Sequence, residues 1–113
     1  MIVIYHNPKC KIAGKCINIL ETRNVDQSRI KHEDLVLTEE KLRKILSLLN
    51  YNPIDIIRKR HFLWKSLLKN LNFTDDELIK VILQYPKLMK NPIVINGNKA
   101  VIGNPPETIL DII

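Results

Sequence analysis

The sequence has little of several features that define whole classes of protein. Glycine (3 residues) and proline (6 residues) are too few for a collagen-like or low-complexity chain, and aromatic residues make up only 5%. No apolar run approaches the ~20 residues that cross a bilayer. Residues 1–6 carry no basic segment ahead of their apolar ones, so they predict a strand and no signal peptide. With only two cysteines, such a chain is expected in a reducing, cytoplasmic compartment.

What remains describes one globular domain with a basic surface. The 113 residues predict a single domain over residues 1–113, and 45% hydrophobic with 27% charged residues is a globular mixture. A net charge of +6 suits a small anion, nucleic acid or a membrane surface. The lysines are spread along the chain, and few aromatics are present to stack on bases. We therefore expect a solvated basic surface, with no nucleic-acid or membrane partner.

The apolar spacing predicts an α/β protein with two sheet-forming halves. The expected elements are a strand at 2–5, a helix at 11–23, a strand at 28–35, helices beginning at Thr38, Pro53 and Thr74, a hairpin over 93–102 turning at Asn96-Gly97, and a terminal helix at 106–113. The first β-α-β unit implies parallel strands, and the hairpin adds an antiparallel pair. The order predicts a mixed four-stranded sheet, with a helical insertion at about residues 38–91 between the β-α-β and β-β-α halves.

Cys10 is the strongest chemical feature. It follows a strand and a proline-containing turn, begins a helix, and lies between Lys9 and Lys11. The exposed N–H groups at a helix start and the neighbouring cations both favour a thiolate. The alternative is an ordinary loop cysteine, but position and charge favour a reactive nucleophile.

Cys16 has the opposite character. It shares an apolar helical stripe with Ile12 and Leu20, which predicts a buried small hydrophobe. Six residues of helix separate Cys10 from Cys16 by ~9 Å, which is too far for a disulfide. The cysteines and histidines also lack the short paired spacings of zinc sites, so no metal is expected.

Residues 58–65 are basic with interleaved aromatic residues. Nucleic acid or an acidic partner could use such a segment, but we favour a solvated helix face with Phe62 and Trp64 packed inward. Arg58 stands out, because a guanidinium offers a planar fork of donors to an oxyanion or thiolate.

Residues 5–10, Tyr-His-Asn-Pro-Lys-Cys, resemble the active-site turn of the ArsC-type arsenate reductases, the glutaredoxin-dependent kind with a thioredoxin-like fold. The matching segments cover nearly the whole chain in the same order: 56–59 around Arg58, 73–79, 84–86, 91–95 and 106–112. The resemblance implies a thioredoxin/glutaredoxin-like sheet and a structural cis-proline at Pro92.

The resemblance also implies a mechanism. Cys10 would attack arsenate as a thiolate, Arg58 would hold the anion, and His6 would help to keep Cys10 ionised. Asn7 and Lys11 are assigned to substrate binding. Glutathione is then the co-substrate and glutaredoxin the reducing partner of a monomer that binds no cofactor.

The sequence departs from the family pattern at four positions. Asn91 and Asn104 stand where the family has two further arginines, and Ala13 and Gly14 replace a serine and a basic residue. Asparagine donates hydrogen bonds without charge, so Asn91 and Asn104 are assigned to substrate binding by this weaker means. Three lysines are candidates to supply point charges instead: Lys11, Lys15 and Lys90.

Two alternatives stay open. The family includes Spx-like regulators that bind RNA polymerase and respond to redox state. They typically carry a Cys-x-x-Cys switch, whose second position is Ala13 here. The other alternative is an enzyme of the same chemistry that acts on another oxidised substrate, such as a glutathione mixed disulfide.

Overall fold

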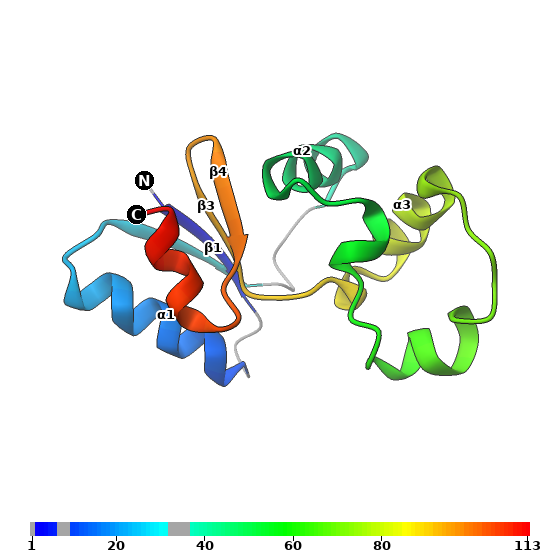
Figure 1. Cartoon of the computed structure of the whole chain (residues 1–113), viewed down its shortest axis with the longest axis horizontal. Helices are drawn as coiled ribbons and strands as arrows, with labels where there is room; N and C mark the ends of the chain where they lie inside the picture. The colour runs from blue at the N-terminus through cyan, green and yellow to red at the C-terminus, as the bar shows by residue number, and fades with distance from the viewer. Residues whose placement is uncertain (1, 7–9, 32–36) are drawn as a thin grey trace. The chain divides into compact units, whose positions relative to one another are not determined.

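The computed structural model describes residues 2–6, 10–31 and 37–113, and the chain forms two compact units. The first unit combines both ends of the chain, Met1–Val36 and Asn91–Ile113, and contains the sheet (Figure 1). The second unit, Leu37–Lys90, is helical. A single domain over residues 1–113, with an insertion at about 38–91, remains a prediction.

The first unit is built on a mixed sheet with the strand order β2-β1-β3-β4. Its strands are β1 (Ile2–His6), β2 (Gln27–Lys31), β3 (Ile93–Asn96) and β4 (Lys99–Ile102). β1 pairs parallel with β2 and antiparallel with β3, which pairs antiparallel with β4. This arrangement confirms the predicted four-stranded, thioredoxin-like fold class.

Two helical elements pack together in this unit. α1 (Lys11–Thr22) connects the parallel strands, and the 3-10 helix η5 (Pro106–Asp111) lies beside it near the C-terminus (Figure 1). Residues four apart in α1, Cys16 and Leu20, point to the core, and so do alternate residues of β1. The core cluster contains Ile2, Ile4, Cys16, Leu20, Val94, Ile109 and Ile112. Each such aliphatic side chain contributes about 1.5–3 kcal/mol on burial.

Several predicted boundaries differ from the structure: β1 ends one residue later than expected, at His6, and α1 ends one residue earlier, at Thr22. β2 begins at Gln27, one residue earlier than expected, and positions 32–35 of the predicted strand lie outside the described residues. The hairpin turns at Gly97 and Asn98, because Asn96 still pairs with Lys99. Gly97 has a φ of 62°, which glycine adopts at no steric cost. The terminal helix is a 3-10 helix over Pro106–Asp111.

The second unit consists of short helical elements around its own core. Its elements are α2 (Glu39–Leu49), the 3-10 helix η2 (Pro53–Ile56), the π-helical turn η3 (Trp64–Leu68), α3 (Asp75–Gln84) and the 3-10 helix η4 (Pro86–Leu88). An antiparallel bridge joins Ile57 to Met89. Both residues of this bridge are buried, as are Leu42 of α2 and Ile82 of α3.

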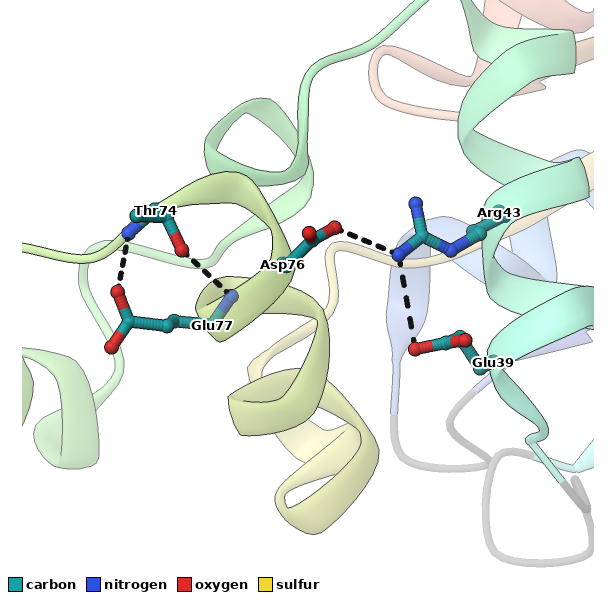
Figure 2. A network of polar contacts seen from close by, with 5 residues as sticks. All are labelled: Glu39, Arg43, Thr74, Asp76 and Glu77. Carbon is teal, nitrogen blue, oxygen red and sulfur yellow. Dashed lines mark hydrogen bonds and ion pairs between the residues drawn. The ribbon is translucent and has the colours of Figure 1, made fainter.

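A polar network joins α2 and α3 at the surface of this unit (Figure 2). Arg43 of α2 donates to Asp76 of α3 at 2.9 Å, and its Nη2 lies 3.8 Å from a Glu39 oxygen. Thr74 and Glu77 form a reciprocal capping box at the start of α3, with hydrogen bonds of 3.2 and 3.0 Å.

The same network lowers two carboxyl pKa values. A hydrogen bond from Arg43 lowers the pKa of Asp76, and hydrogen bonds from Thr74 lower that of Glu77. Both carboxylates therefore stabilise the folded chain above their unfolded pKa values. This contribution is lost as the pH falls through the lowered pKa values of the folded chain.

Replacing Thr74 by alanine tests the capping box. The variant leaves the Glu77 backbone N–H without its side-chain acceptor, so the free energy of unfolding should fall by about 1 kcal/mol in urea titrations. Thr74→Ser should retain most of the stability that the cap provides. Thr22→Ala is the matched control: its hydroxyl donates to the Asn18 carbonyl of α1 and caps nothing, and its effect should stay below about 0.5 kcal/mol. Equal losses at both threonines would contradict the capping role.

Candidate active site

The register of the sheet brings several predicted site residues to one edge. β1 ends at His6, the first residue of β3 (Ile93) pairs with Tyr5, and the last residue of β4 (Ile102) pairs with Ile93. The chain therefore leaves β1, enters β3 and leaves β4 at the same edge of the sheet. The site residues in these connections are Cys10, Asn91, Pro92 and Asn104.

Cys10 is the N-cap residue of α1. Its backbone is extended (φ −81°, ψ 114°), and its carbonyl accepts the Gly14 N–H at 3.4 Å. Its half-buried side chain makes no capping hydrogen bond, and the first turn of α1 contains no acidic residue. The N-terminus of a helix carries a partial positive charge and free N–H groups, which stabilise an anion. The position suits a negatively charged sulfur or substrate oxygen.

Cys16 is buried, as its place in the apolar stripe predicts, and its exposed fraction is 0%. Its thiol donates to the Gly103 carbonyl at 3.3 Å. Burial raises the pKa of Cys16 to about 11, and the charges of Cys10 and Glu107 act in the same direction. Both cysteines are free thiols. Because its pKa is raised, Cys16 is held in its neutral form in the core.

Gly103 connects α1 to the two loops that carry the asparagines. Its N–H donates to the Pro92 carbonyl at 2.8 Å, and its carbonyl accepts the Cys16 thiol. A Cβ atom at this position would lie 2.7 Å from the Cys16 Sγ and 3.0 Å from the Pro92 Cγ. Only glycine fits, because any side chain would separate α1 from the turn before Asn104.

The asparagines themselves are accessible beside this junction. Asn91 is half-buried and Asn104 is exposed. Each precedes a cis peptide bond, Asn91–Pro92 and Asn104–Pro105. A hydroxyl bond from Thr108 to the Pro105 carbonyl, at 2.7 Å, holds the turn after Asn104.

The other predicted site residues lie in three places. His6 is half-buried at the end of β1, and Lys11 is exposed at the start of α1. Asn7 lies outside the described residues. Arg58 belongs to the second unit, where it is exposed and its N–H donates to the Leu88 carbonyl at 2.7 Å.

The prediction that Phe62 packs inward is wrong. Its side chain is 68% exposed, whereas Trp64 is half-buried. The N–H of His61 donates to the Arg58 carbonyl at 2.9 Å, so a turn occupies the start of this segment and the helical residues begin only at Phe62. The Phe62 ring stacks on the His61 ring, with centroids 4.8 Å apart.

Residues 2–6, 10–31 and 37–113 contain no group of three His, Cys, Asp or Glu side chains placed to hold a metal ion. None of the helices in these ranges is long and apolar enough to cross a membrane.

Known proteins resemble this chain over almost its full length. The model of the ArsC family matches residues 5–112. An arsenate reductase of Haemophilus influenzae is 35% identical, over 99% of this chain and 98% of its own. The protein YfgD of Escherichia coli is 32% identical, over 99% and 96%. The structure of an arsenate reductase from Vibrio cholerae superposes with a TM-score of 0.91 at 32% identity, covering 99% of this chain and 97% of that one.

Two glycine-to-alanine substitutions test the junction at Gly103. Gly103→Ala forces a methyl group against the Cys16 sulfur, so the free energy of unfolding should fall by about 1–3 kcal/mol. Adding Cys16→Ala removes that sulfur and should recover part of the loss, which a double-mutant cycle measures.

Gly14→Ala is the matched control. A Cβ there meets nothing within 4 Å, and the residue lies inside α1, so alanine should stabilise the chain by up to about 1 kcal/mol. Strict additivity of the two changes at Cys16 and Gly103 would show that the contact does not couple them.

Proposed function

This chain belongs to the ArsC family, and on that premise we propose that it reduces arsenate, with the Cys10 thiolate as the nucleophile. The observation that carries the proposal is the contrast between its two thiols. Cys10 is accessible at the N-cap of α1, whereas Cys16 is buried with its pKa raised to about 11. Burial thus suppresses the reactive anionic form at Cys16, whereas Cys10 lies at a helix start, a position that stabilises anions.

The reaction transfers two electrons. The Cys10 sulfur attacks arsenate and displaces an oxygen, which leaves as water after protonation. A glutathione thiolate then attacks the Cys10 sulfur of this adduct, forming a disulfide between Cys10 and glutathione. The arsenic–sulfur bond breaks with its electron pair on arsenic, which departs as arsenite. Each thiol has contributed one electron, and glutaredoxin with a second glutathione restores the Cys10 thiol.

The neighbouring groups supply positioning and charge. The free N–H groups at the start of α1 and the exposed Lys11 would attract the anion, and Arg58 would bind two of its oxygens. Asn91 and Asn104, at the same sheet edge as Cys10, would donate neutral hydrogen bonds. His6, at the end of β1, would stabilise the Cys10 thiolate. In this proposal the protein is a cytoplasmic monomer that uses glutathione as co-substrate and binds no cofactor.

A coupled assay tests the proposal. Arsenate reduction is followed through NADPH consumption with glutathione, glutaredoxin and glutathione reductase. Wild-type protein should turn over, and Cys10→Ser should lose all activity because an alcohol is not a competent redox nucleophile. Cys16→Ser is the matched control and should stay active, since its hydroxyl still donates toward Gly103. Arg58→Gln should lower kcat/KM on the order of 100-fold.

Three results would contradict the proposal. Inactivity of the wild type with arsenate, combined with saturable reduction of a glutathione mixed disulfide, would assign the same thiol chemistry to another substrate. Activity that survives in Cys10→Ser would remove Cys10 as nucleophile. Equal loss of activity in Cys10→Ser and Cys16→Ser would show that removing either thiol has the same general effect.

A further inference from the structure

The second unit carries a cluster of basic groups around Arg58. The N–H of His61 donates to the Arg58 carbonyl at 2.9 Å, which brings the two residues into one turn. The N–H of Arg58 donates to the Leu88 carbonyl at 2.7 Å, which places Arg58 beside the end of η4, where Lys87 lies. Backbone hydrogen bonds therefore hold Arg58 and His61 in one turn and place that turn beside the segment that contains Lys87.

No carboxylate neutralises this cluster among the residues that the structure describes. Residues 58–70 contain five Lys or Arg and no Asp or Glu. Glu39 and Asp76 of this unit pair with Arg43 of α2. Arg58 and Lys87 are both exposed. An anion from solution is thus the available source of compensating charge.

The His61 ring is held in one orientation. Its Nδ1 accepts the Leu63 N–H at 3.2 Å, so the neutral ring carries its proton on Nε2. The Phe62 ring stacks on it at 4.8 Å with an angle of 25° between the planes. These two contacts use Nδ1 and one face of the ring, and leave the Nε2–H as a hydrogen-bond donor.

The electrostatics of His61 agree with this geometry. Burial lowers the pKa of His61, and the positive charges of Arg58 and Lys87 lower it further. Lys59, Arg60 and Lys65 are the other charged residues near it in sequence, and all are basic. An anion placed among these groups would oppose the charge repulsion and raise the pKa of the ring.

We infer that the Nε2–H of His61, with Arg58 and Lys87, forms a binding site for a tetrahedral oxyanion in the second unit. The site extends the anion-holding role of Arg58 to two residues that the family resemblance does not assign. Only the identity of the physiological anion as arsenate rests on the proposed function. Anion binding itself requires no turnover.

The site has a defined pH dependence. A neutral His61 donates one hydrogen bond from Nε2, whereas protonation at Nδ1 adds a full positive charge and ends the hydrogen bond that Nδ1 accepts from the Leu63 N–H. Anion affinity should therefore rise as the pH falls through the pKa of His61. By reciprocity, saturation with the anion must raise that pKa. Each unit of increase means that the anion binds the protonated form of the protein tenfold more tightly than the neutral form.

Sulfate is the probe for the test. It is tetrahedral, does not react with thiols, and keeps its double charge between about pH 5 and pH 8, whereas arsenate titrates in this range. The His61 ring is followed by NMR in the full chain as sulfate is added, and affinities are measured by calorimetry. Wild-type protein should bind sulfate saturably, and the pKa of His61 should rise on saturation.

Four variants separate the site from general positive charge. Lys87→Gln should raise the pKa of His61 in the free protein and weaken sulfate binding roughly fivefold. His61→Gln, which keeps a donor but does not titrate, should bind at about pH 8 and lose the pH dependence. Lys59→Gln and Lys44→Gln remove equal charges from the same unit, and each should weaken binding less than twofold.

Two results would overturn the inference: a His61 pKa that sulfate does not move, or equal weakening by Lys59→Gln and Lys87→Gln. Failure of the proposed function gives a different pattern. If arsenate turnover is absent but sulfate moves the His61 pKa as expected, the anion site stands and the reductase activity falls. If turnover is present while the His61 and Lys87 variants bind sulfate as wild type does, the inference alone falls.

Discussion

The close approach of α1 to the turn after β4 is the constraint on which the candidate site depends. It requires a residue without a Cβ at position 103, since a methyl group there would lie 2.7 Å from the Cys16 sulfur. Both polar groups of the Gly103 backbone are used, one toward Cys16 and one toward Pro92. Cys10 is the N-cap of α1, Asn91 precedes Pro92, and Asn104 follows Gly103. The contact among Cys16, Pro92 and Gly103 therefore fixes the backbone segments that carry Cys10 and the two asparagines.

This constraint separates the roles of the two cysteines. Cys16 fills the core and donates a hydrogen bond, and burial holds its thiol neutral by raising its pKa. Cys10 lies at a helix start with an accessible thiol, where anions are stabilised. The environment of Cys16 thus gives it a structural role, and the proposed nucleophile is the accessible thiol of Cys10. Within the second unit, Arg58 lies on a turn with His61, and the charges of Arg58 and Lys87 lower the pKa of that histidine.

Local chemistry was predictable from the sequence, whereas contacts between distant segments were not. The helix start at Cys10 and the capping box at Thr74 follow from patterns within a few residues, and both are present. The hydrogen bond between Cys16 and Gly103 spans 87 positions, and no local pattern encodes it. The inward placement of Phe62 is wrong because the alternation of basic and aromatic residues does not fix where the helix begins: a hydrogen-bonded turn precedes it, helical residues begin at Phe62, and its ring is exposed.

The identity of the sulfur that reacts with arsenate is the central claim, and mass spectrometry tests it most directly. Protein is incubated with arsenate and glutathione without glutaredoxin, so that the disulfide formed in the reaction accumulates. The account predicts one glutathione per chain, formed only when arsenate is present and mapped to Cys10, with Cys16 unmodified. A glutathione adduct that forms equally without arsenate, or one that maps to Cys16, would contradict it.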